Sequence, residues 1–259
     1  MTKNKELEKF YQGVYLKGEK KHFTPFVTKG TTSAEAKEVI NEIKWHNKTV
    51  LDVGCGTGNF ASLVAKNGAK RILGIDYAEE AIKIAKKKHV HSNLDFKQMD
   101  VKHVKEKFDV IVSIGTLEHM DNPYQILKKF KKLLNKNGKI IITSPNWSNP
   151  RGHMLMMLYF LFDAPITLAD LHYLTPKDFE KWAKKMNMRL KWHTFERSWA
   201  HGEILVKDFQ KRIPNILNDM KIDIEKSKID RLIHWIKRDI VGFDNSLEHS
   251  GAIGLYILK

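Results

Sequence analysis

Short apolar runs alternate with amphipathic stretches between residues 49 and 195 of this 259-residue chain. An apolar run bounded by turn residues is typical of a buried strand, and apolar positions repeating every three or four residues are typical of a helix. The predicted strands are Thr49 to Gly54, Arg71 to Asp76, Leu94 to Asp100, Phe108 to Gly115, Gly138 to Pro145, Met188 to Phe195 and Ser250 to Lys259. The predicted helices are Asn59 to Lys66, Ala78 to Lys88, Pro123 to Lys136 and Thr175 to Met186.

The order of these elements predicts an α/β fold. Strands that alternate with helices connect through right-handed crossovers, so they lie parallel in a doubly wound sheet. We therefore expect a Rossmann-like, mostly parallel seven-stranded sheet. Sheets of this kind bind ligands beyond the carboxyl ends of their strands, at the topological switch point.

Two stretches interrupt the alternation, residues 146–174 and residues 196–250. The second contains two amphipathic helical patterns, Glu203 to Met220 and Glu225 to Val241. We predict an N-terminal helical segment over residues 1–48 and one domain over residues 49–259, into which both stretches are inserted as a helical cap.

The first insertion contains a Met-rich apolar run, Met154 to Phe162. This run is about half of the ~20 residues that a transmembrane helix needs, so it predicts no transmembrane segment. Three interpretations stay open: the core of an inserted helix, a flexible lid over a hydrophobic ligand, and an interfacial anchor in peripheral contact with a membrane.

The chain has 45 Lys and Arg against 30 Asp and Glu, a formal net charge of +15. Such an excess favours an acidic partner such as nucleic acid or anionic lipid. However, only seven of the basic residues are Arg. Arg is the residue suited to bidentate recognition of phosphates and bases. Nucleic acid is therefore disfavoured as a partner, although charge alone does not rule it out.

Cys55 is the only cysteine of the chain. It excludes an intramolecular disulfide and a multi-cysteine zinc site, and it suits a reducing compartment. The N-terminal residues lack the apolar stretch of a secretion signal. We therefore expect a cytoplasmic protein without a metal site.

A glycine-rich turn follows the first predicted strand and precedes a helix, with Gly54, Gly56 and Gly58 in it. Glycines at such a turn let a ligand approach the backbone amides closely. Asp76 ends the next strand 18 residues after Gly58, where an acid can bridge two ribose hydroxyls, and Asp100 ends the third strand in the same way. The pattern predicts a nucleoside-bearing cofactor.

Two classes of cofactor compete for this loop. A nicotinamide or flavin dinucleotide carries a pyrophosphate, which Asp52, two residues before Gly54, would repel. S-adenosylmethionine has no phosphate and bears an ammonium and a sulfonium. The spacing G-x-G-x-G also departs from the dinucleotide pattern G-x-G-x-x-G, so S-adenosylmethionine is favoured.

The chain resembles the class I S-adenosylmethionine-dependent methyltransferases. VLDVGCGTGNF is similar to their first motif, GIDYAEEAIKIAKK to the second, QMDV to the third, FDVIVSIGTLEHMDNPYQIL to the fourth and LLNKNGKIIITSPN to the segment around strand five. These motifs cover Thr49 to Asn146 in the family's order. The resemblance makes residues 49–259 the S-adenosylmethionine-binding catalytic domain and S-adenosylhomocysteine its product.

The resemblance implies a role for each matching residue. The methionine end of the cofactor would contact Asp52, Gly54, Cys55, Gly56 and Gly58, with Asp52 near the amino group and Cys55 as a small loop filler. Asp76 with Tyr77 would hold the ribose. Asp100 with the Val101 amide would hold the adenine. Ile114, Gly115 and Thr116 would flank the sulfonium.

The LEHM sequence is similar to the strand-four loop of methyltransferases that act on small metabolites, including the ubiquinone-biosynthesis O-methyltransferases. His119 would then lie near the transferred methyl group and accept a proton from a hydroxyl or amine acceptor. The alternative is that His119 only caps or orients this loop. His153, His172, Tyr173 and His201 are further candidates, each of which could equally be a surface or packing residue.

The sequence DNPY, Asp121 to Tyr124, resembles the motif of adenine amino-methyltransferases, but it does not directly follow strand four, and Pro123 is well placed to start a helix.

We therefore predict transfer of a methyl group to a small acceptor, most simply at oxygen. The lid interpretation would make that acceptor hydrophobic. The alternatives are an RNA or protein methyltransferase and a non-catalytic cofactor-binding partner module. The oligomeric state is left open.

Overall fold

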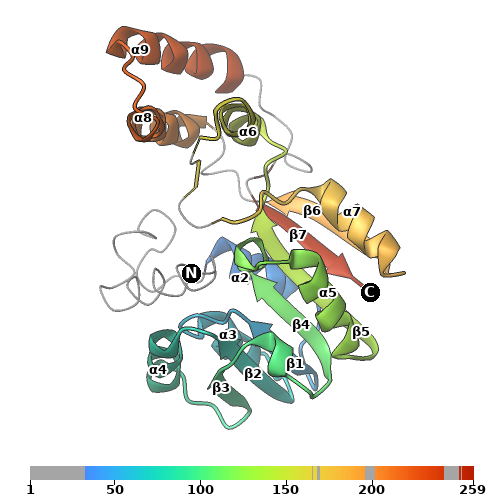
Figure 1. Ribbon diagram of the computed structural model, residues 1–259. Helices are drawn as coiled ribbons and strands as arrows, with labels where there is room; N and C mark the ends of the chain where they lie inside the picture. The colour runs from blue at the N-terminus through green and yellow to red at the C-terminus, as the bar shows by residue number, and fades with distance from the viewer. Residues whose placement is uncertain (1–32, 165, 168–169, 196–201, 242–250, 252) are drawn as a thin grey trace. The chain divides into compact units, whose positions relative to one another are not determined.

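The computed structural model describes residues 33–164, 166–167, 170–195, 202–241, 251 and 253–259 (Figure 1). Its strands form one seven-stranded sheet in the order β3-β2-β1-β4-β5-β7-β6. Their bounds are β1 Thr49–Val53, β2 Arg71–Asp76, β3 Leu94–Gln98, β4 Phe108–Ile114, β5 Leu134–Pro145, β6 Leu190–Phe195 and β7 Ile253–Leu258. The order reverses between β1 and β4, which makes their carboxyl ends the switch point of the sheet.

The central strands pair in parallel. β1 lies between β2 and β4, so that Leu51 pairs with both Leu73 and Ile111. All three side chains are at most 1% exposed. Near-continuous apolar strands of this kind are expected where helices cover both faces of a parallel sheet.

The last two strands, β6 and β7, run antiparallel to each other. Arg189, just before β6, and Lys259, just after β7, exchange both of their backbone hydrogen bonds, at 2.7 and 2.9 Å. This reciprocal pair is the signature of antiparallel strands. The predicted mostly parallel, seven-stranded sheet is therefore confirmed.

Every helix that the apolar periodicity predicts is present, together with one helix before β1 and one directly after β5. Their bounds are α2 Ala34–Asn41, α3 Asn59–Lys66, α4 Glu79–Lys88, α5 Pro123–Lys132, α6 Pro150–Phe162, α7 Pro176–Lys185, α8 Gly202–Asp219 and α9 Lys226–Trp235, with the short turns η2 Val101–His103, η3 Leu117–His119 and η4 Ile236–Ile240. Pro123 begins α5, and the Asn122 side chain accepts a hydrogen bond from the Gln125 amide at 3.1 Å. The DNPY sequence is therefore a helix start in this fold.

The boundary between α5 and β5 was predicted wrongly. The helix ends at Lys132, and β5 begins at Leu134 instead of Gly138. Leu134 pairs with Phe108, and the register then shifts before Val110. Asn137, with a φ of 63°, is therefore part of an irregularity inside the strand and does not stop a helix.

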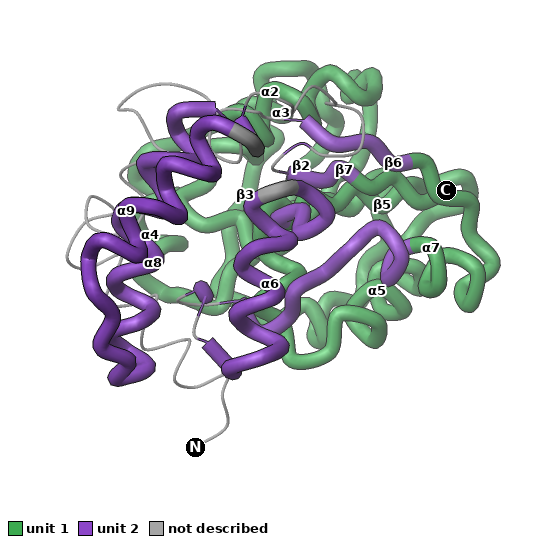
Figure 2. Tube along the Cα trace, turned by 90° about the horizontal axis from the view of Figure 1, so that it is seen from above, with its two compact units in different colours: residues 1–144, 180–191, 256–259 green, residues 145–179, 192–255 purple. Residues whose placement is uncertain are grey.

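The chain divides into two compact units (Figure 2). Unit 1 comprises residues 1–144, 180–191 and 256–259, and unit 2 comprises residues 145–179 and 192–255. The ranges of unit 2 include both predicted insertions, and their function as a cap stays a prediction. Of the predicted segment 1–48, the first 32 residues lie outside the described residues.

Unit 2 has a core of its own, to which the Met-rich helix α6 contributes. Leu155 is fully buried there, and Met154, Met156, Leu158 and Tyr159 are partly buried against the same core. The opposite side of α6 is exposed, at Met157, Phe160, Leu161 and Phe162. The Met-rich run therefore forms an inserted helix that packs into a core with only part of its surface. No helix in the described ranges is long and apolar enough to cross a membrane.

Candidate functional site

The glycine-rich loop lies directly at the carboxyl end of β1. The amides of Gly54 and Cys55 both donate to the Ile75 carbonyl of β2, at 2.8 and 3.0 Å. Gly54, Gly56 and Gly58 have φ values of 75°, 51° and 80°, in the left-handed region that favours glycine. The loop thus crosses from β1 to α3 in a conformation that only glycine adopts at low cost.

Two of these glycines are also required by neighbouring side chains. A Cβ at Gly54 would lie 2.3 Å from Cγ2 of Thr116, and one at Gly58 would lie 2.5 Å from Cζ of the Phe96 ring. The sequence pattern predicts that these glycines allow a ligand to approach the backbone. At these two positions the structure adds a second reason, since the chain itself fills the space.

Asp76, at the end of β2, connects the glycine-rich loop to the next helix. One carboxylate oxygen accepts a hydrogen bond from the Gly56 amide and the other from the Ala78 amide, both at 2.9 Å. Burial raises the pKa of Asp76, and these amide hydrogen bonds oppose that rise. Each oxygen keeps a further lone pair with which it can accept a ligand hydroxyl.

Asp52 is a buried acid with an unused acceptor. Its side chain is 2% exposed, and Oδ2 has no hydrogen-bond partner among the described residues. Burial, together with the neighbouring Asp76, raises the pKa of Asp52 to about 7. Because a buried acceptor without a donor is costly, this position suits a ligand that brings a cationic donor. The ammonium of S-adenosylmethionine fits that requirement.

Cys55 is 8% exposed and lies beside Gly74, where an added Cβ would come within 3.1 Å of its sulfur. Burial and the carboxyls of Asp52 and Asp76 raise the pKa of the Cys55 thiol. A thiol held in its protonated form is a poor nucleophile. Its packing is that of a small loop filler.

Asp100 follows β3 and is more exposed than the other two acids. Its carboxylate accepts from the Lys102 amide at 2.8 Å and lies 2.9 Å from the Lys102 ammonium. Burial opposes ionisation, but these interactions outweigh it and lower the pKa of Asp100. Val101 is 4% exposed. Tyr77, after β2, is partly buried and accepts a hydrogen bond at its carbonyl from Gln98.

The carboxyl end of β4 brings together residues that are distant in the sequence. The Gly115 amide, just after Ile114, donates to the carbonyl and to the hydroxyl of Thr143 in β5, both at 3.1 Å. The Thr143 hydroxyl donates in turn to the Glu35 carboxylate of α2, at 2.9 Å. The three residues form a relay from a backbone amide to a carboxylate.

A second carboxylate approaches the same glycine. A Cβ built on Gly115 would lie 3.6 Å from Oε1 of Glu35 and 3.9 Å from Oε1 of Glu118. Glu118 is 3% exposed, and burial raises the pKa of Glu35. His119 is close by, with Nε2 4.0 Å from Glu118 Oε1. The end of β4 therefore carries three groups that can accept a proton.

Glu35, Glu118 and Thr143 were absent from the sequence prediction. Glu118 lies inside the LEHM sequence beside His119, so that motif could have indicated it. Glu35 belongs to an N-terminal stretch with weak patterning, and its contact with Thr143 spans 108 positions. No local signal could have shown that pairing.

The remaining candidates belong to unit 2 or lie outside the described residues. His153 is exposed on α6, and His201 lies outside the described residues. Tyr173 packs against the rings of Trp147 and Tyr159, with centroids 5.0 and 4.7 Å away, which supports a packing role. His172 is partly buried in unit 2.

The sequence model of a family described as a methyltransferase domain matches residues 44–234. The ubiquinone biosynthesis O-methyltransferase of Pseudomonas paraeruginosa (strain DSM 24068 / PA7) is 27% identical over 56% of this chain and 66% of that protein. The protein of the same name from Actinobacillus pleuropneumoniae serotype 7 (strain AP76) is 30% identical over 61% of this chain and 75% of that protein. The chain thus spans just under two thirds of the first relative.

Solved structures with the same fold are also found. The structure of DhpI in complex with SAH has a TM-score of 0.59 and 10% sequence identity, and the match covers 99% of this chain and 96% of that one. At this identity the likeness concerns the fold. It agrees with the seven-stranded sheet described above.

The pKa of Asp52 predicts how stability depends on pH. Because this pKa rises from 3.8 to about 7 on folding, the folded state holds the proton more tightly than the unfolded state. The protonated Asp52 carboxyl therefore stabilises the folded state fully below the pKa of Asp52 in the unfolded chain, and this stabilisation is lost as the pH rises through about 7. Asp52→Asn cannot ionise, so at a pH of about 8 it should be more stable than wild type, by up to about 4 kcal/mol.

Urea unfolding of both proteins at pH values of about 4 and 8 measures this difference. The gain should be present at the higher pH and absent at the lower one. The exposed Asp95→Asn serves as the matched control and should show no such gain. Equal stability of Asp52→Asn and wild type at the higher pH would show that the Asp52 carboxyl is not confined as described.

Proposed function

The chain belongs to the methyltransferase-domain family, and on that premise we propose that it transfers the methyl group of S-adenosylmethionine to a hydroxyl oxygen of a small acceptor. The names of the two relatives, both ubiquinone biosynthesis O-methyltransferases, support oxygen as the accepting atom. S-adenosylhomocysteine is the second product.

We propose that the cofactor binds at the carboxyl ends of β1, β2, β3 and β4. Asp52 would hold the ammonium, Asp76 the ribose hydroxyls, and Asp100 with Val101 the adenine. The loop residues Gly54, Cys55, Gly56 and Gly58 would contact the methionine end, with Tyr77, Ile114 and Gly115 beside the nucleoside and the sulfonium. When bound, S-adenosylmethionine supplies an electrophilic methyl group.

The observation that carries the hydroxyl assignment is the group of proton acceptors around Gly115. A neutral hydroxyl oxygen gains positive charge as it forms its bond to carbon, and its proton must leave. The carboxylates of Glu35 and Glu118 both lie within 4 Å of a Cβ built on Gly115, with His119 4.0 Å from Glu118. These groups can stabilise that charge and accept the proton, while the buried surroundings exclude water.

The accepting atom can be tested with a matched set of small acceptors. A phenol, an aniline and a thiophenol of the same carbon skeleton are incubated with methyl-labelled S-adenosylmethionine, and products are identified by mass spectrometry. We expect label in the phenol. Derivatives of that phenol with alkyl chains of increasing length show whether a hydrophobic acceptor is preferred. Label confined to RNA or protein in a parallel extract would contradict a small acceptor.

The cofactor site can be tested at Asp76. Asp76→Ala removes both amide hydrogen bonds as well as the ribose contact, so we expect S-adenosylmethionine to bind at least about ten-fold more weakly. Isothermal titration calorimetry measures the affinity, and thermal unfolding checks that the variant is folded. The exposed Asp95→Ala is the control. Wild-type affinity in Asp76→Ala would place the ribose elsewhere.

The proton acceptor can be assigned by comparing Glu35→Gln with His119→Ala. Loss of a general base typically lowers turnover by about 100-fold or more. The base variant should lose kcat while keeping its affinity for S-adenosylmethionine, and it should lose the acidic limb of the pH–rate profile. Glu38→Gln, on the same helix as Glu35, is the control. Turnover within about two-fold of wild type in both variants would remove both residues from catalysis.

A further inference from the structure

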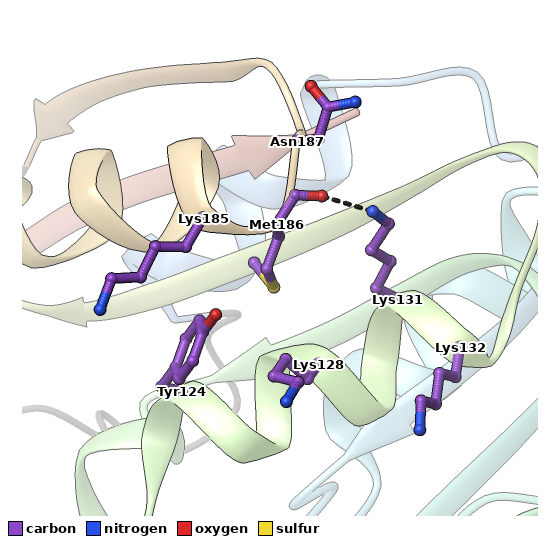
Figure 3. A pocket seen from close by; sticks show the side chains of 7 residues that line it. All are labelled: Tyr124, Lys128, Lys131, Lys132, Lys185, Met186 and Asn187. Atoms are coloured by element: carbon purple, nitrogen blue, oxygen red, sulfur yellow. Dashed lines mark hydrogen bonds between the residues drawn. The ribbon is translucent and has the colours of Figure 1, made fainter.

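A groove on unit 1 lies between α5 and the end of α7, and it is separate from the residues assigned to the cofactor and the acceptor. Its volume is about 520 Å³. Figure 3 shows that one wall is formed by α5 and the other by the last residues of α7 and the turn after it. The lining residues are Tyr124, Lys128, Lys131, Lys132, Lys185, Met186 and Asn187.

Four of the seven lining residues are lysines, and none is acidic. Lys128, Lys131 and Lys132 are spaced three and four positions apart on α5, which puts them on one side of the helix, and Lys185 faces them from α7. All four are exposed. None of them forms an ion pair with a carboxylate in the part of the chain that the structure describes. The groove therefore has a positive charge that is not neutralised there.

The positions of the ammonium groups are partly determined by their neighbours. The Lys128 and Lys185 ammoniums lie 5.7 and 5.6 Å from the centroid of the Tyr124 ring, which itself stacks on Trp182. Lys131 donates instead to the Met186 carbonyl, as the dashed line in Figure 3 shows. Two ammoniums thus lie beside the Tyr124 ring, and those of Lys131 and Lys132 lie farther along the groove (Figure 3).

Helix dipoles explain only part of this arrangement. Lys131, Lys132 and Lys185 lie in the last turns of their helices, where a cation is favourable by about 0.3–1 kcal/mol. Lys128 is in the middle of α5 and gains nothing comparable. No acid lies within α5 to offset the repulsion among its lysines. A local structural role therefore does not account for the whole set.

We infer that this groove binds the sugar–phosphate backbone of single-stranded RNA. Charges spread along a groove match a polyanion better than they match one compact anion. Lysine is a hydrated point charge suited to phosphate oxygens, and phosphate contacts carry no base sequence. The scarcity of Arg disfavours nucleic acid in the sequence, but contacts to phosphate alone do not need the bidentate geometry of Arg, so the lysine groove revises that expectation.

The composition of the groove also disfavours an acidic protein as the occupant. The central parts of protein–protein interfaces are enriched in Arg and aromatic residues and depleted in Lys. Here the lining has four lysines and no arginine. A flat membrane surface would meet protruding charges, whereas these lie along a recess of about 520 Å³.

The test uses the full chain and a fluorescein-labelled oligouridylate of about 12 nucleotides, a length typical of single-strand sites. Fluorescence anisotropy is recorded from about 50 to 200 mM salt. We compare wild type with Lys128→Gln/Lys185→Gln and with the single variant Lys132→Gln. The double variant should bind about ten-fold more weakly or worse at low salt. The slope of log affinity against log salt should become shallower by about one to two, because two phosphate contacts are lost.

The matched control is Lys86→Gln/Lys87→Gln, two exposed lysines in the last turn of α4 that give the same change in net charge. It should keep wild-type RNA affinity, and all variants should bind S-adenosylmethionine as wild type does, which shows that they are folded. The inference is overturned by three results: wild type does not bind RNA at low salt, both double variants weaken equally, or polyglutamate or anionic phospholipid vesicles compete as well as unlabelled RNA.

Discussion

The arrangement of the candidate site depends on one carboxylate, that of Asp76, because it bonds two backbone amides from different parts of the chain. Its oxygens hold the Gly56 amide of the loop after β1 and the Ala78 amide at the start of the next helix. The loop is tied to β2 a second time through the Ile75 carbonyl. Two strand ends therefore form one rigid edge, which keeps Asp52 in a confined position.

That edge is acidic in a chain of net charge +15, and the separation of charge has physical consequences. Asp52 is buried with an unused oxygen, and Glu35 and Glu118 approach Gly115. Because burial makes ionisation of a carboxyl costly, Asp52 with its unused oxygen favours a ligand that brings positive charge or a donated proton. Four exposed lysines, three on α5 and Lys185 on α7, instead line a separate groove.

Most strands and helices could be predicted because their signals are local. The DNPY segment illustrates this, since Asn122 and Pro123 start α5 through contacts within one helical turn. The end of α5 could not be predicted in the same way. Leu134 continues the apolar spacing of the helix, but pairing with Phe108 draws it into β5, and this pairing depends on a strand distant in sequence.

The sequence by itself determined the order of the elements, the glycine-rich loop and the acids at the strand ends, because periodicity, turn glycines and strand-end positions depend on neighbouring residues. Only the tertiary structure decided that Gly54 and Gly58 make room for Thr116 and Phe96. It also decided that Glu35 reaches Thr143 across 108 positions. Such contacts arise when strands and helices pack, and no local pattern encodes which distant side chains will meet.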